Sequence, residues 1–133
     1  MSVHHVNPDS LARPRGFSHA TVATGTTVFL AGQTAVDASG AMVGGNSVVT
    51  QFEVALSNLL TALNAAGGRP ADLASLTIYL VDLDDYRAHS REIGRVWKRL
   101  VGATYPAMAA IGVARLWDPE ALVEVQGFAV LGG

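Results

Sequence analysis

The feature that most restricts the fold is an apolar stripe in residues 47–66. Its members recur at i, i+3 and i+4, which places them on one face of an α-helix: Phe52, Ala55, Leu56, Leu59, Leu60 and Leu63. The other face is polar and has Glu53 as its only charge; its members are Gln51, Ser57, Asn58, Thr61 and Asn64. Asn46 or Ser47 is expected to cap the start of the helix, and Gly67 to end it. A helix with one apolar face needs a second layer to cover it.

Segments with β-forming patterns lie on both sides of this helix. Residues 20–33 are predicted to form a hairpin that turns at Gly25. Residues 76–83 alternate and are rich in β-formers, and residues 107–115 and 122–131 are predicted to be two further strands. The second layer is therefore expected to be a β-sheet.

A second helix is predicted between the strand at residues 76–83 and the strand at residues 107–115. Asp82, Asp84 and Asp85 suit the positive N-terminal end of a helix, which is expected to run to about Leu100. The predicted order is therefore β-β-α-β-α-β-β, with right-handed crossovers between parallel strands. This order predicts an α+β fold, a mixed sheet with two helices packed on one face, whose other face a second copy of the chain would cover.

Composition narrows the class of protein. A chain of 133 residues fits a single domain, 1–133. It is 50% hydrophobic and 15% charged, and so small a protein has little interior, so the excess apolar surface is expected to lie in an oligomer interface. A net charge of -2 gives no reason to expect nucleic acid or a membrane surface as a partner.

Several chemistries are not expected. The chain has no cysteine, so a disulfide or a thiolate site is excluded. His4 and His5 are expected to lie in a mobile N-terminal end, and together with His19 and His89 they show no metal-ligand spacing. No signal-peptide core is present and no apolar run reaches about 18 residues, so a cytoplasmic location is expected by default.

Short motifs in a fixed order run along nearly the whole chain. They are Gly16-Phe17-Ser18-His19-Ala20, Leu30-Ala31-Gly32-Gln33, Gln51, Asn58, Gly67, the run from Tyr79 to Tyr86, Tyr105-Pro106-Ala107, and the run from Ala121 to Val125. This series resembles the RidA/YjgF family, also called L-PSP endoribonuclease-like proteins. The resemblance implies a chorismate-mutase-like fold and a homotrimer with a barrel-like centre and a cleft at each subunit boundary. It also implies hydrolysis of enamines and imines to ketones and ammonia, without a metal or organic cofactor.

The same resemblance points to the site residues. Active members carry an arginine that grips the substrate carboxylate where this chain has Met108, and a catalytic carboxylate that is retained as Glu124. Other polar groups of the family are replaced at four positions: Phe17 for a tyrosine, Ala31 for a serine or threonine, Ser90 for an asparagine and Ala110 for a cysteine. A thioether cannot neutralise a carboxylate. We therefore expect a protein that binds a small molecule, such as a carboxylic acid or an imine, with altered or absent deaminase activity.

Two alternatives remain open at this stage. The protein could be an active, cofactor-independent hydrolase whose cation is relocated to Arg13, Arg15 or Arg115. Arg115 lies seven residues after Met108, so a regular strand would place it on the opposite face. The third function, RNA binding or a regulatory interaction, would use a basic stripe with i+4 spacing: Arg87, Arg91, Arg95 and Arg99. That stripe is also typical of a solvated helix face or an ion-pair seam.

Three further residues have two interpretations each. Glu124 is the site carboxylate, or else an exposed residue or ion-pair partner on an alternating strand. His19 is a general base, or else a packing and hydrogen-bonding residue of a strand. Trp117 lines either a cleft or an interface.

Overall fold

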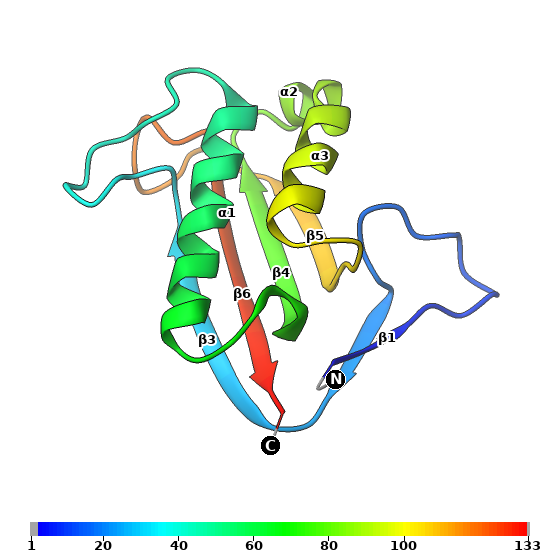
Figure 1. The fold of residues 1–133 in the computed structure, drawn as a ribbon. Coiled ribbons are helices and arrows are strands. Elements are labelled where there is room, and N and C mark those ends of the chain that lie inside the picture. The colour runs from blue at the N-terminus through cyan, green and yellow to red at the C-terminus, as the bar shows by residue number, and fades with distance from the viewer. Residues whose placement is uncertain (1–2, 133) are drawn as a thin grey trace.

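The computed structural model describes residues 3–132 of the 133-residue chain. Figure 1 shows the elements, which in chain order are β1 (Val3–Val6), β2 (Ala20–Ala23), β3 (Thr26–Gln33), α1 (Val48–Ala65), the 3-10 helix η1 (Pro70–Asp72), β4 (Leu73–Leu80), α2 (Leu83–Ala88), α3 (Ser90–Leu100), β5 (Ala107–Gly112) and β6 (Val123–Leu131). No helix in this part of the chain is long and apolar enough to cross a membrane.

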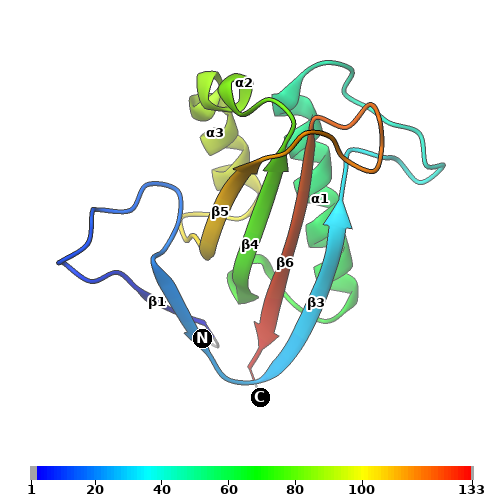
Figure 2. The ribbon, with the colours of Figure 1, turned by 180° about the vertical axis from the view of Figure 1, so that it is seen from behind.

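The main sheet has the order β3-β6-β4-β5 and is mixed. β4 and β5 are parallel, as the crossover through α2 and α3 predicts, whereas β6 is antiparallel to both β3 and β4. α1 and α3 cover one face of this sheet (Figure 1), and no helix covers the other face, which Figure 2 shows from behind. The predicted α+β fold with helices on one face of a mixed sheet is confirmed.

The apolar stripe of α1 forms the centre of the core. All its predicted members are buried except Leu60, which is half-buried. They pack on the alternating positions of the central strands that face the helices: Leu76, Ile78, Leu80, Val123 and Val125. Gln51, which the pattern assigns to the polar face, is 0% exposed.

Gln51 tolerates burial because every polar atom of its amide has a partner. Its Nε2 donates to the carbonyls of Gly45 at 2.8 Å and Glu120 at 3.2 Å, and its Oε1 accepts from the backbone N–H of Leu122 at 2.8 Å. The side chain thus joins the start of α1 to the segment that enters β6, a role that the pattern of one helix does not reveal.

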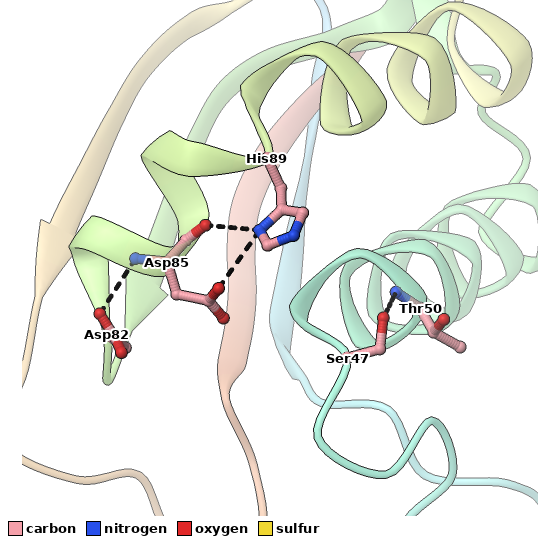
Figure 3. Close-up of polar contacts among 5 residues, drawn as sticks. All are labelled: Ser47, Thr50, Asp82, Asp85 and His89. Carbon is pink, nitrogen blue, oxygen red and sulfur yellow. Dashed lines mark hydrogen bonds and ion pairs between the residues drawn. The ribbon is translucent and has the colours of Figure 1, made fainter.

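Polar side chains set the helix ends, as Figure 3 shows. Ser47 accepts a hydrogen bond from the Thr50 N–H at 3.1 Å, and Asp82 accepts one from the Asp85 N–H at 3.0 Å. The prediction of one unbroken second helix was wrong, because His89 at φ -107 and ψ 21 leaves helical geometry and separates α2 from α3. The His89 Nδ1 lies 2.9 Å from the Asp85 carbonyl oxygen, a hydrogen bond that is the largest cause raising the pKa of His89.

The predicted hairpin over residues 20–33 was also wrong. β2 pairs with β1 in a separate two-stranded sheet, and an isolated bridge from Ser18 to Ala107 places this segment beside β5. β3 lies at the opposite edge of the main sheet (Figure 1). Gly25 permits this change of direction, since its φ of 146 suits glycine and a Cβ there would collide with the Leu131 carbonyl oxygen.

Three further strand boundaries also depart from prediction. Residues His4 and His5, expected in a mobile end, belong to strand β1, whose Val3 is 2% exposed. β5 ends at Gly112 rather than at residue 115, so Arg115 lies in an exposed loop and strand alternation does not decide its direction. β4 starts at Leu73, three residues earlier than the alternation suggests.

Replacing Ser47 by alanine should lower the free energy of unfolding by about 1 kcal/mol, because the Thr50 N–H loses its acceptor at the start of α1. Chemical denaturation measures this change. Ser57→Ala is the matched control, because Ser57 is an exposed residue inside the same helix and alanine is favoured there. Equal losses in both variants would contradict the assignment of Ser47 as the cap.

Candidate functional site

A cavity of about 430 Å³ lies between α3, β5 and residues 15–17. Most of its lining is apolar or aromatic, including Phe17, Ile78, Tyr86, Trp97, Tyr105 and Met108. Its polar contributions come from Arg15 and from the hydroxyls of Ser90 and the tyrosines. Size and lining are those of a small-molecule site.

Strand pairing directs two predicted site residues into this cavity. β5 pairs in register with β4, which sets Met108 beside Leu76 and Ala110 beside Ile78. Leu76 and Ile78 are buried under the helices, and neighbours in register share a face of the sheet. Met108 and Ala110 therefore face the helix side, where both line the cavity.

Two stacked aromatic rings form part of the wall. The rings of Trp97 and Tyr105 lie 5.4 Å apart at an interplanar angle of 10°. The Trp97 Nε1 donates to the Thr104 carbonyl at 3.0 Å, which fixes the orientation of the indole. Burial raises the pKa of Tyr86 to about 12, so its hydroxyl keeps its proton at neutral pH. This wall offers a flat apolar surface and the protonated Tyr86 hydroxyl.

Ser18 holds residues 15–17 against the start of β5. Its backbone N–H donates to the Pro106 carbonyl at 2.9 Å, and its hydroxyl donates to the Tyr105 carbonyl at 2.6 Å. The His5 Nδ1 lies 3.1 Å from the same hydroxyl. These bonds position Phe17, which is half-buried and lines the cavity.

His19 has a structural role in this segment. Its Nε2 lies 2.6 Å from the Ala12 carbonyl oxygen, and its ring meets Phe17 edge-on with the ring centres 5.1 Å apart. It is not among the residues that line the cavity. Of the two interpretations given above, the packing and hydrogen-bonding role fits this geometry.

Glu124 lies on the other face of the sheet. Its register partner is Tyr79, which alternates with the buried Ile78 and Leu80, so Glu124 points to the helix-free face. A bulge between Leu30 and Gln33 accommodates it there: a Cβ on Gly32 would collide with the Glu124 carboxylate. Ala31 is exposed in the same bulge.

One chain therefore divides the six predicted site residues into two groups. Four of them line the cavity on the helix side: Phe17, Ser90, Met108 and Ala110. Ala31 and Glu124 do not line it. Sequence patterns did not single out Gly94 and Tyr86, which also line the cavity, although their spacing from Ser90 on the second helical segment could have pointed to them.

The environment of Glu124 favours its protonated form. Burial is the larger cause that raises the pKa of this carboxyl, and the negative charge of Asp118 is the second. Asp118 itself accepts a hydrogen bond from the Thr34 hydroxyl at 2.7 Å. A carboxyl with a raised pKa can both accept and return a proton closer to neutral pH than an ordinary glutamate.

One of the four arginines of the basic stripe forms an ion pair. The Arg99 Nη2 lies 2.8 Å from the Glu53 Oε1 of α1, an exposed pair that joins the two helices. Arg87, Arg91 and Arg95 are exposed. Trp117, in the loop before β6, is 93% exposed and lies outside the cavity lining. Within residues 3–132, no group of three or more His, Asp or Glu side chains is arranged to hold a metal ion.

The Glu124 carboxyl should titrate above its ordinary value of 4.5 in a carbon-detected NMR titration. Asp118→Asn should lower this pKa part of the way, because burial remains, and Glu120→Gln in the same loop should leave it unchanged. Since the folded state holds this proton more tightly, its stabilising contribution is fully present below pH 4.5 and is lost as the pH rises through the folded pKa. Titration at or below 4.5 would contradict this account.

Comparison with known proteins gives the family. The family model described as Endoribonuclease L-PSP matches residues 8–131. A 2-iminobutanoate/2-iminopropanoate deaminase of Capra hircus is 35% identical over 107 residues, which are 80% of this chain and 74% of the relative. The crystal structure of YyfB from Yersinia pestis, a Rid family protein of unknown function, is 36% identical with a TM-score of 0.89, covering 98% of this chain and 100% of that one. E. coli TdcF with bound serine is 25% identical with a TM-score of 0.71, covering 95% and 94%. This chain is thus a member of the RidA/YjgF family.

Proposed function

We propose that this protein is a homotrimer that binds a small molecule in clefts between its subunits and has weak or no imine deaminase activity. The observation that carries the proposal is that Met108 and Ala110, which bring no charge, line a mostly apolar cavity. In the proposal the protein works in the cytoplasm and needs no metal or organic cofactor.

The helix-free face of the sheet supports the proposed assembly. Phe29 is 77% exposed there and meets Phe128, 42% exposed, with ring centres 5.4 Å apart. Ile111, on the same face by its register with Tyr79, is 43% exposed. Exposed apolar side chains of this size on one face of a sheet are typical of a surface that an interface buries. Three such faces would form the barrel-like centre of a chorismate-mutase-like trimer.

The division of the site residues also favours an assembly. In one chain the sheet separates Glu124 from the cavity that Met108 lines. A single copy therefore does not combine the carboxylate with the cavity. In the proposed trimer, Glu124 of one copy completes the cleft of a neighbour.

The weak activity follows from charge. The Capra hircus relative is named for 2-imino acid substrates, and such substrates carry a carboxylate. Removing one partner of a buried, hydrogen-bonded charge pair costs about 2–5 kcal/mol in comparable interfaces, and Met108 supplies no charge. Binding of a small ligand is retained in the proposal, in keeping with the serine found in E. coli TdcF.

A second candidate is an active deaminase with a relocated cation. One observation favours it: Arg15 lines the same cavity as Met108. The exposed position of Arg15 sets it apart from the half-buried Met108, so its charge is more strongly screened by water. We therefore favour the first candidate.

The wild-type protein should release ammonia from a freshly generated 2-aminoacrylate-type imine no faster than the imine decays in buffer. Met108→Arg should raise kcat/KM by about tenfold or more, because a charge-assisted bond to the carboxylate is regained. Met108→Gln is the control, since it adds polarity without charge. Robust turnover by the wild-type protein would sink the proposed loss of activity.

Phe29→Asp should break the trimer, because it places a charge at the centre of the proposed interface. Light scattering after size-exclusion chromatography measures the mass. Ser57→Asp adds the same charge on the exposed side of α1 and should leave the mass at three copies. A wild-type monomer, or a Phe29→Asp variant of unchanged mass, would refute this assembly.

A further inference from the structure

We propose that Arg15 recognises the anionic group of an organic acid whose aromatic or similarly large apolar body fills the cavity. This inference rests on the proposed function, because it assigns a class of ligand to the same cavity. It differs from a deaminase site in its cation, which stands at the edge of the cavity instead of at position 108, and in the larger apolar body of its ligand.

Arg15 is the single charged side chain among the residues that line the cavity. Within residues 3–132 it has neither a hydrogen-bond acceptor nor an ion-pair partner, whereas Arg99 pairs with Glu53. The two hydrogen bonds of Ser18 hold the segment that contains Arg15 against the start of β5. A guanidinium offers donors that match a carboxylate in a bidentate pair, so this free group suits an organic acid.

The aromatic part of the cavity lining selects the body of the ligand. The stacked Trp97 and Tyr105 rings and the Met108 side chain give a flat, apolar and polarisable surface. The volume of about 430 Å³ falls within the range of sites that hold drug-sized molecules. A three- or four-carbon imino acid would leave much of this surface in contact with water. A ring joined to a carboxylate by a short chain would cover it.

Gly94 keeps the helix side of the cavity open. Glycine is unfavourable inside a helix, yet a Cβ at this position would meet no atom within 4 Å. Packing within the chain therefore does not require glycine here, and the residue borders the cavity instead. One turn away on either side, Arg91 and Lys98 are exposed and add positive potential on this side of the helix, which also favours an anion.

The tryptophans permit a direct test. The chain has two, Trp97 in the cavity wall and Trp117, which is 93% exposed. Trp117→Phe leaves Trp97 as the only indole, so its fluorescence reports occupancy of the cavity. Titration with 3-phenylpropanoate and with the neutral 3-phenylpropanamide then separates the charge of a ligand from its shape.

The acid should bind about three- to tenfold more tightly than the amide. Arg15→Gln should remove this preference by weakening the acid alone, and added salt should reduce it. Arg13→Gln is the matched control, because Arg13 lies two residues away, is exposed and does not line the cavity. It should keep the preference of the parent protein.

A series at Gly94 tests the cavity itself. Gly94→Ala should raise the thermal midpoint, since alanine favours the helix and its Cβ meets no atom of the chain, and it should weaken both probes less than a larger side chain does. Gly94→Leu should weaken both probes by about tenfold or more, because its side chain takes up ligand space. Circular dichroism of each variant establishes that the fold is kept.

Three outcomes would overturn this inference: equal binding of acid and amide, a preference that survives Arg15→Gln, or no response to either probe at millimolar concentration. None of these depends on ammonia release. Rapid imine turnover combined with an Arg15-dependent preference would refute the proposed loss of deaminase activity and leave the ligand class standing. Slow imine turnover without an Arg15-dependent preference would refute the ligand class and leave the proposed loss of deaminase activity standing.

Discussion

The packing of α1 on β6 and β3 is the interaction on which the rest of the structure depends. β6 lies between β3 and β4 and is antiparallel to both, so it joins strands that are distant in sequence. The buried residues of α1 cover the helix side of β3 and β6. Because side chains alternate along a strand, covering one face fixes which residues the sheet presents on the other. Function is thereby divided between two surfaces of one layer.

The helix-covered surface holds the cavity and the helix-free surface holds the carboxylate. Met108 is directed inward by its register with Leu76, and Glu124 is directed outward by its register with Tyr79. A chain that needed both groups in one place would have to meet another copy of itself. The exposed Phe29 and Phe128 rings give an apolar reason for the same meeting. Assembly and chemistry thus place the same demand on this sheet.

Sequence patterns predicted the elements whose structure is local. The stripe of α1 and its cap at Ser47 depend on neighbours three or four residues away, and both were right. The hairpin failed because β2 pairs with β1, a short strand whose pattern is too brief to recognise. The burial of Gln51 did not follow from the helix pattern, because two of its hydrogen-bond partners are backbone atoms of a loop far along the chain. The faces of Met108 and Glu124 could not be predicted either, since they depend on the register of strands that the sequence does not align.

In the proposed site the charge belongs to an exposed residue of the lining, Arg15, instead of to position 108, and this difference changes what the cavity would select. A buried cation must be neutralised by every ligand that enters, so it restricts the site to small acids that reach it. An exposed guanidinium such as Arg15 is already solvated and needs no ligand to remain stable. Selection then falls to the apolar wall of Trp97, Tyr105 and Met108, with the charge adding orientation more than affinity. In the proposed function, the absence of a charge at position 108 thus leaves the choice of ligand to the shape of the apolar wall.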